Sequence, residues 1–421
     1  MISSRSASSD FRAVLDPSAP ASPAFRAAIS AKIGTFLDAK FPVVAAMGPE
    51  LIGVHRMARE LLTGGKRLRP AFCVWGYVAA AGHPAEPNAL LSAAASLDLL
   101  HVSALVHDDV MDSSDLRRGQ PAAHRQFEAL HDSAGWLGER ESFGRAGAIL
   151  LGDLLVMWSV EMLSQCGLPD SDLRYALPVV EAMRTEVTCG QYLDVLAQVH
   201  PLRADDIPPR AHASQPKDTS RAHASQPKDT PRAHASGPED ATPSAPDQIA
   251  VAGALADASR VVEFKSARYT VQRPCQFGAA LAGADQRLQS VLAAYGSPLG
   301  RAFQFRDDLL GVFGDPLVTG KPSGDDLREG KRTVLIAHAY ARSDSAGRDM
   351  LAALLGNPAL DEDGVAILQE LISSAGAREA VERMIEDGYS QAMEALARAE
   401  ISDEGRTALS GLADAAVRRT F

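Results

Sequence analysis

The chain has 421 residues, of which 46% are hydrophobic but only 5% aromatic, a composition that favours packed helices over sheets. Its formal net charge is −11 and no basic stripe runs along it, which argues against nucleic acid as a partner. Uninterrupted apolar runs stay well below the ~18 residues of a membrane-spanning helix, so no transmembrane segment is predicted.

Residues 1–26 are predicted to form a disordered tail, because they are rich in Ser, Ala and Pro and lack an apolar core of signal-peptide length. The remainder, 27–421, is predicted to be one helical domain. The chain contains four cysteines, Cys73, Cys166, Cys189 and Cys275. They show neither paired nor metal-finger spacing, so we expect buried, reduced thiols in a cytoplasmic protein.

Apolar, helix-compatible segments follow one another along the chain, separated by Pro and Gly, and no alternating strand pattern competes with them. The expected helices cover residues 91–106, 148–165, 177–198, 252–272, 288–313 and 334–341, followed by an amphipathic stretch over 376–418. The first segment is apolar all round, which is typical of a buried central helix. We therefore predict an all-α fold, a single large helical bundle with a central active-site cavity.

An 11-residue sequence that begins at Arg210 recurs from Arg221 and, in degenerate form, from Arg232. Every copy contains Pro and none contains a large apolar residue, so these repeats cannot build a packed core. Residues 203–247 are therefore predicted to be a disordered insertion in the helical domain. Each copy carries one His, but nothing rigid holds the three together as metal ligands.

Two acidic clusters lie inside apolar, helix-compatible segments: Asp108-Asp109-Val110-Met111-Asp112 and Asp307-Asp308. Asp108 and Asp112 are four residues apart, which on a helix places both carboxylates on one face. A single such pattern is more often a solvated acidic helix end than a metal site. Buried carboxylates need a cationic partner, however, and hard oxygen ligands suit Mg²⁺.

Basic residues accompany both acidic clusters. Gly65-Lys66-Arg67-Leu68-Arg69 precedes the first cluster, and Arg117-Arg118 follows it. The cations after the second cluster are Lys321, Arg328, Lys331 and Arg332. Guanidinium forks and ammonium groups are what diphosphate oxygens require. The pattern thus predicts a metal-bridged diphosphate site.

With these motifs, and with Gly190-Gln191-Tyr192-Leu193-Asp194 and Lys265-Ser266-Ala267-Arg268-Tyr269-Thr270 between them, the chain resembles the trans-isoprenyl diphosphate synthases, and most of all the bacterial geranylgeranyl diphosphate synthases. The resemblance implies a homodimeric prenyltransferase that uses three Mg²⁺ ions. It would condense isopentenyl diphosphate head-to-tail with an allylic diphosphate, either dimethylallyl, geranyl or farnesyl. The expected product is a trans-polyprenyl diphosphate of twenty carbons.

The resemblance also implies roles for individual residues. Asp108, Asp112 and Asp307 would hold the metal ions. The phosphates of the allylic substrate would contact Arg117, Lys265, Gln304, Lys321 and Lys331, while isopentenyl diphosphate would contact Gly65, Lys66, Arg69, His101 and Arg118. Asp109 would belong to the catalytic group, and Gln191, Ser266 and Tyr269 would shield the carbocation.

Ser103, Ala104 and Leu100 precede Asp108 on the same predicted helix, and we expect them to line the tunnel for the growing chain. Short-chain members of the family carry aromatic rings at the level of Ser103 and Ala104, so the small side chains here predict a product longer than fifteen carbons.

Two positions depart from the family pattern. Gly311 stands where the second acidic motif usually has a third Asp, and Ser266 stands where Thr is usual. We expect the first change to remove one ligand but not activity, and the second to be mild because the hydroxyl is kept.

Some assignments have simpler structural explanations. His101 could be a hydrogen-bonded core histidine, and Lys265 could merely extend its ammonium to solvent. Asp98, in the same apolar segment, has no assigned role beyond pairing with a nearby cation.

Two other functions share part of the pattern. A terpene cyclase has an Asp-rich motif in a helical bundle, but it has no use for a second diphosphate site. A non-catalytic subunit of a heteromeric synthase would be expected to lose one acidic cluster, whereas this chain has both.

Overall fold

The chain folds almost entirely into helices, as predicted. The computed structural model describes residues 13–199, 245–315, 323–357 and 359–418. The N-terminal half contains α2 (Pro23–Met47), α3 (Leu51–Leu61), α4 (Leu68–Ala81), α5 (Pro87–Met111), α6 (Ala123–Ala134), α7 (Arg140–Ser164) and α8 (Asp170–Val199). The C-terminal half contains α9 (Ala245–Val261), η2 (Val262–Gln272), α10 (Arg273–Leu281), α11 (Gln286–Phe313), α13 (Asp325–Glu329), α14 (Val334–Arg342), α15 (Ser345–Leu354), α16 (Glu362–Ser374), α17 (Ala377–Ala397) and α18 (Asp403–Val417).

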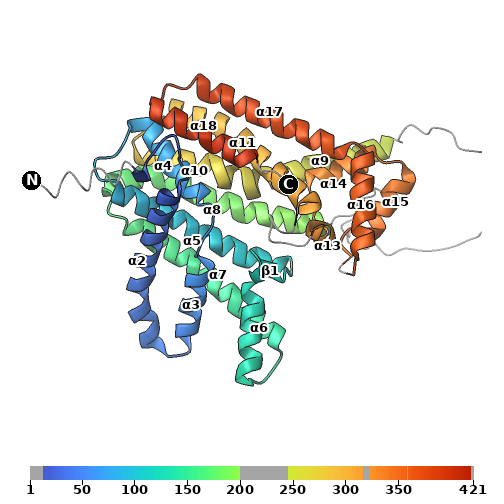
Figure 1. Ribbon diagram of the computed structural model, residues 1–421, viewed down its shortest axis with the longest axis horizontal. Coiled ribbons are helices and arrows are strands. Elements are labelled where there is room, and N and C mark those ends of the chain that lie inside the picture. The colour runs from blue at the N-terminus through green and yellow to red at the C-terminus, as the bar shows by residue number, and fades with distance from the viewer. Residues whose placement is uncertain (1–12, 200–244, 316–322, 358, 419–421) are drawn as a thin grey trace, which may run out of the picture.

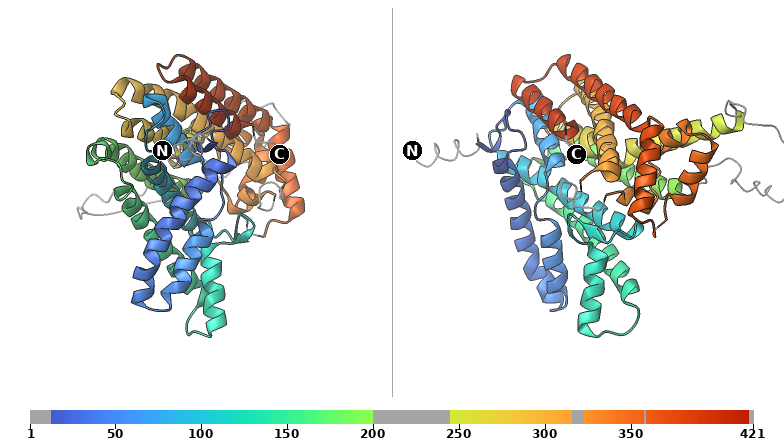
Figure 2. Two further views of the ribbon diagram at one scale, coloured as in Figure 1. Left: turned by 60° about the vertical axis from the view of Figure 1, so that its left-hand side comes forward. Right: turned by 45° about the vertical axis from the view of Figure 1, so that its right-hand side comes forward.

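Helix α5 runs through the middle of the bundle and packs against α2, α4 and α7 (Figure 1). Its residues 93–100 are all buried, so the prediction of an apolar central helix is confirmed. The α2–α3 pair and α6 project from one side of the bundle (Figure 2). The side chain of Asp112, at the C-cap of α5, is only 1% exposed, so the acidic end of α5 is turned into the fold.

The segment predicted as one helix over 252–272 is divided into α9 and a π-helix, η2. The wider backbone lies between α8 and α11, and glycines on both sides make this close approach possible. A Cβ at Gly190 of α8 would come within 2.3 Å of the Lys265 backbone nitrogen, and one at Gly300 of α11 within 2.4 Å of the Ala267 carbonyl oxygen. π-helical segments occur frequently at functional sites, and this one carries Lys265 and Ser266.

A small two-stranded ribbon, which the sequence did not predict, follows α5. Strand β1 (Leu116–Arg117) pairs antiparallel with β2 (Gln120–Pro121). Arg118 and Gly119 form the turn with φ of 54° and 73°, the left-handed values of a tight hairpin turn. The turn separates Arg117 and Arg118, so the two guanidinium groups serve different parts of the site.

Two expectations about the chain need correction. Ordered structure begins before residue 27, because Leu15 and Phe25 are buried and the Trp75 indole donates to the Pro20 carbonyl at 2.9 Å. Cys189 is exposed, although the other three cysteines are buried and all four are free thiols. The repeats and residues 1–12 lie outside the described residues.

Among the described residues, two helices, α5 and α7, are long and apolar enough to cross a membrane by length and composition, although neither is an uninterrupted apolar run. The most apolar part of α5 is 72% buried within the protein, and that of α7 is 44% buried. A buried helix at the centre of a bundle meets the same criterion, so the finding is weak evidence for a membrane span.

Candidate active site

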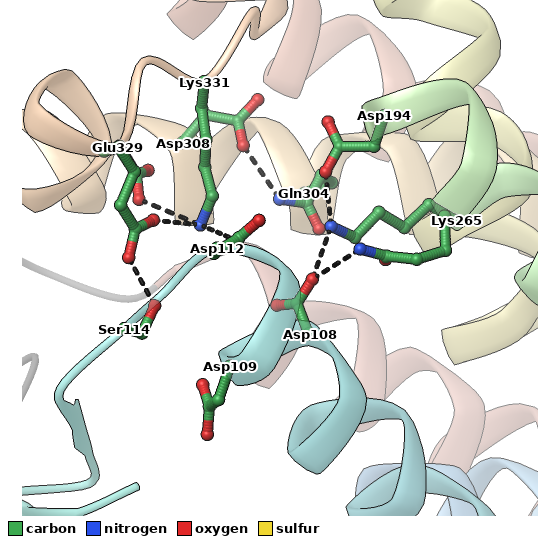
Figure 3. Close-up of polar contacts among 12 residues, drawn as sticks. Asp108, Asp109, Asp112, Ser114, Asp194, Lys265, Gln304, Asp308, Glu329 and Lys331 are labelled. Carbon is green, nitrogen blue, oxygen red and sulfur yellow. Dashed lines mark hydrogen bonds and ion pairs between the residues drawn. The ribbon is translucent and has the colours of Figure 1, made fainter. Parts of the chain in front are cut away.

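Three carboxylates converge at the C-terminal end of α5. Asp108 and Asp112 of α5 and Asp194 of α8 each place an oxygen within 4.8 Å of the others (Figure 3). Both carboxylate oxygens of Asp112 are buried and accept no hydrogen bond within the described residues. Closely spaced carboxylates, one of which accepts no hydrogen bond, fit a divalent cation such as Mg²⁺. The pair expected from its spacing in sequence therefore does face one site.

Lys265 extends from η2 into this cluster. Its ammonium donates to Asp108 at 2.9 Å and to Asp194 at 2.6 Å, and the Gln191 amide donates to Asp108 at 2.8 Å. Burial opposes the charged forms of both partners, but their attraction lowers the pKa of Asp108 and raises the pKa of Lys265. Both groups are therefore ionised at neutral pH, and Lys265 is an ion-pair partner inside the site, not a surface lysine.

Lys331 brings a second ammonium to the opposite side of the cluster, from the loop between α13 and α14 (Figure 3). Its nitrogen lies 2.6 Å from Glu329, 3.3 Å from Asp112 and 3.5 Å from Asp326. Burial would lower the pKa of Lys331, but these carboxylates raise it well above its ordinary value. The cluster thus contains two lysines that stay charged among the carboxylates.

Asp109 lies apart from the other carboxylates of its motif and points away from them (Figure 3). It is buried, and it accepts a hydrogen bond at 2.9 Å from Nε of Arg117, whose guanidinium also lies 3.7 Å from Asp108. Asp109 therefore orients the Arg117 guanidinium and does not face the other carboxylates. Its expected place in the catalytic group is thus indirect.

The second acidic motif lies on α11. Asp308 is 4% exposed, accepts a hydrogen bond from Gln304 at 2.8 Å, and has one oxygen without a hydrogen-bond donor among the described residues. Burial, with additional repulsion from Asp326 and Asp307, raises the pKa of Asp308 to about 8. Asp308 is therefore mostly protonated at neutral pH, whereas Asp307, the first residue of the motif, is half-buried.

A cluster of arginines lies around His101, two turns before Asp108 on α5. The Arg69 guanidinium stacks 4.2 Å from the centre of the Tyr269 ring and donates to the Thr270 hydroxyl at 2.9 Å. The Arg118 guanidinium lies next to Gly65, since a Cβ added to Gly65 would be 3.3 Å from one of its nitrogens. Burial, followed by the nearby arginines, lowers the pKa of His101 well below its ordinary value. The neutral imidazole and the guanidinium groups form a site suited to an anion.

Arg67, which belongs to the same basic motif, is held in a buried ion pair. It adopts a left-handed φ of 52° and pairs with Asp98 at 2.8 Å, with both side chains about 5% exposed or less. It also donates to the Leu62 carbonyl at 2.7 Å. The unassigned Asp98 is thus the partner of a buried cation, in the turn that presents Lys66 and Arg69.

Other predicted residues are placed as follows. Ser266 lies on η2 beside Lys265, and Lys66 is exposed. Lys321 lies outside the described residues. Arg328 donates to the Ser323 and Leu360 carbonyls, so it braces the loop and does not enter the carboxylate cluster.

Three carboxylates in the site, Asp194, Glu329 and Asp326, were not assigned from the sequence. Asp194 ends the motif that begins at Gly190, and this motif is the sequence signal by which it could have been assigned. Glu329 accepts from the Ser114 hydroxyl at 2.5 Å and thereby joins the α13 loop to the segment after α5. No spacing pattern in the sequence indicates this contact, because the two residues are far apart in the chain.

The predicted tunnel residues precede Asp108 on α5. Ser103 is 1% exposed, Leu100 is buried, and Ala104, one turn before Asp108, is half-buried. They therefore lie between the acidic cluster and the core of the bundle.

Comparison with known proteins finds one family along most of the chain. The model of the polyprenyl synthetase family matches residues 53–208 and 240–372. A geranylgeranyl pyrophosphate synthase from Corynebacterium glutamicum, solved with isoprenyl diphosphate and magnesium, is 35% identical, with a TM-score of 0.78 and coverage of 93% of this chain and 98% of that one. A (2E,6E)-farnesyl diphosphate synthase from Mycobacterium tuberculosis is 29% identical over 84% of this chain and 80% of its own length. A geranylfarnesyl diphosphate synthase from Aeropyrum pernix is 28% identical over 85% and 91%.

Proposed function

This chain belongs to the polyprenyl synthetase family and is a trans-prenyltransferase, and on that premise we propose that it makes geranylgeranyl diphosphate, of twenty carbons. Enzymes of the family use Mg²⁺ and join isopentenyl diphosphate to an allylic diphosphate. The observation that supports two diphosphate sites in this chain is the arrangement along α5. The carboxylate cluster at Asp108 and the arginine cluster at His101 lie two turns apart on one helix.

The allylic diphosphate would bind at the carboxylate cluster. Asp108, Asp112 and Asp307 would hold up to three Mg²⁺ ions, which when bound neutralise the diphosphate and make it a better leaving group. Lys265, Lys331 and Arg117 would donate to its oxygens, with Gln304 beside them and Lys321 from outside the described residues. Lys265, Lys331 and Arg117 already lie at the cluster before the substrate arrives, so little reorganisation accompanies the reaction.

The allylic C–O bond would break first, and its electron pair would leave with the diphosphate. The double bond of isopentenyl diphosphate, held through its own diphosphate by Lys66, Arg69, His101 and Arg118 near Gly65, would then attack the allylic carbocation. Loss of a proton from the adjacent carbon to the released diphosphate completes the new double bond. Gln191, Ser266 and Tyr269 would exclude water from the carbocation.

Incubation of the purified protein with Mg²⁺, isopentenyl diphosphate and each of dimethylallyl, geranyl and farnesyl diphosphate tests this function. We expect a twenty-carbon prenyl diphosphate as the main product. Cyclic hydrocarbons formed without use of isopentenyl diphosphate would instead indicate a terpene cyclase. Activity only after addition of another subunit would indicate a non-catalytic partner.

We also propose that the enzyme is a homodimer. Four large apolar side chains on α7 are exposed, namely Ile149, Leu150, Met157 and Val160. Such a face on a soluble enzyme would be covered by a second copy. Leu150→Glu, at a position 68% exposed, should leave the fold intact but reduce the mass measured by light scattering from that of a dimer to that of a monomer. Ile367→Glu on exposed α16 is the control and should stay dimeric.

A separate prediction concerns the buried ion pair below the isopentenyl diphosphate site. Asp98→Asn leaves the Arg67 charge buried without its counter-ion, which commonly costs about 3–5 kcal/mol. Because Arg67 holds the turn that presents Lys66 and Arg69, we expect the KM for isopentenyl diphosphate to rise about tenfold. The KM for the allylic substrate should change little, because that substrate would bind at the carboxylate cluster and not at this turn.

Steady-state kinetics with each substrate varied in turn check this result, and Asp98→Glu, which keeps the charge, should recover most of the loss. An equal rise in both Michaelis constants would mean that the substitution acts through general unfolding and not through the turn.

A further inference from the structure

The second acidic motif on α11 lacks a side chain where a third carboxylate would stand. Gly311 follows Asp307 by four residues, so a side chain there would lie on the same face of the helix, one turn later. Glycine inside a helix costs about 1 kcal/mol relative to alanine. Its presence at the active-site end of α11 therefore calls for a reason other than helix stability.

The space beside Gly311 is filled by a carboxylate from another element. A Cβ at position 311 would come within 1.9 Å of Oδ2 and 2.5 Å of Cγ of Asp326. No real Cβ makes contacts this short, so any side chain at 311 would displace the Asp326 carboxylate. The two positions thus exclude each other: either residue 311 or Asp326 can place a group at this point.

Asp326 is held in this position by the loop that also carries Lys331. Helix α13 begins after Gly324, whose φ is 72°, and the Asp326 carbonyl accepts a backbone hydrogen bond from Lys331 at 3.0 Å. The Asp326 carboxylate lies 3.5 Å from the Lys331 ammonium, which is also 3.3 Å from Asp112. Asp326 therefore faces the first acidic cluster across a shared cation.

We propose that Asp326 supplies the carboxylate that Gly311 cannot, so that the second metal-binding motif is assembled from Asp307 of α11 and Asp326 of α13. The proposal rests on the proposed function, since it concerns Mg²⁺ and diphosphate at that site. It assigns Gly311 a role as well, which is to leave the room that the Asp326 carboxylate occupies.

The test measures the affinity for Mn²⁺ in the presence of inorganic diphosphate. Electron paramagnetic resonance gives the concentration of free Mn²⁺ at each point of the titration. Asp326→Ala should weaken Mn²⁺ binding about tenfold or more, the range seen when groups that orient metal ligands are removed. Gly311→Ala should weaken it similarly, because the methyl group displaces Asp326, although alanine favours the helix and the protein should melt no lower. The double variant Gly311→Asp/Asp326→Ala, which moves the carboxylate to α11, should bind Mn²⁺ within about threefold of the wild type.

Glu370→Ala is the charge control, because it removes one exposed carboxylate from the neighbouring α16 and should leave Mn²⁺ binding unchanged. Thermal melting checks that every variant is folded, and Asp326→Asn replaces Asp326→Ala if the latter is not. Wild-type affinity in the folded Asp326 variant, or no recovery in the double variant, would overturn the proposal. If Asp108→Asn abolishes Mn²⁺ binding while Asp326→Ala does not, only this inference fails; if the wild type itself does not bind, the proposed function fails.

Discussion

Replacing Asp108 or Asp307 by alanine should lower kcat/KM by about a hundredfold or more, since each change removes charge neutralisation from a water-poor site. Asp108 is the more sharply defined of the two. Its carboxylate receives hydrogen bonds from Lys265 and Gln191 and lies within 4.8 Å of the Asp112 and Asp194 carboxylates. Its loss leaves Lys265 paired with Asp194 alone and takes one oxygen ligand from the cluster.

Single-turnover measurements with saturating Mg²⁺ distinguish a slower bond-breaking step from weaker substrate binding. The control is Asp387→Asn, an exposed carboxylate on α17, which should react at the wild-type rate. A folded Asp108→Ala or Asp307→Ala protein with a near-wild-type rate would exclude the proposed use of these carboxylates.

Contacts between residues close together in the sequence could be predicted, whereas contacts between distant residues could not. Asp108 and Asp112 share one helix, and four residues of separation suffice to place them on one face. The Lys265 ion pair with Asp108 joins residues 157 positions apart, and no pattern in the sequence indicated it. Contacts of this kind depend on which helices become neighbours, and hydrophobic periodicity does not specify that.

The π-helix shows a different limit. The apolar pattern of 252–272 is compatible with an α-helix throughout, and nothing in it marks the change at Val262. The wider backbone goes together with the close approach of Gly190 and Gly300 from the helices on either side. A tertiary contact thus determines a local conformation, so no window of the sequence contains the information.

Asp109 and Arg67 illustrate a third limit, which is direction. Both lie in motifs next to residues that face the site, yet each is turned into the protein and pairs with another charged side chain. A motif identifies the segment that forms a site, but adjacent residues on a helix or in a left-handed turn point to different sides. The structure was needed to separate the residues of the site from those that support them.

Ser103→Phe should shorten the main product to fifteen carbons or fewer. In the proposed function the growing chain extends from the diphosphate at Asp108 into the bundle along α5, where Ser103 is 1% exposed and Leu100 is also buried. An aromatic ring buries about 150–250 Å², which corresponds to roughly one or two isoprene units of tunnel. Leu100→Ala should have the opposite effect and lengthen the product, because it removes bulk from the expected floor of the tunnel.

Chromatography of the dephosphorylated products measures both shifts in chain length. The matched control is Leu105→Phe, at a half-buried position on another face of α5. Melting curves show whether each variant is folded, since a larger side chain in a packed core costs about 1–3 kcal/mol. If the wild type stops at fifteen carbons, or if folded Ser103→Phe gives the wild-type distribution, the chain-length role of this face of α5 is wrong, whereas the prenyltransferase activity is unaffected by that outcome.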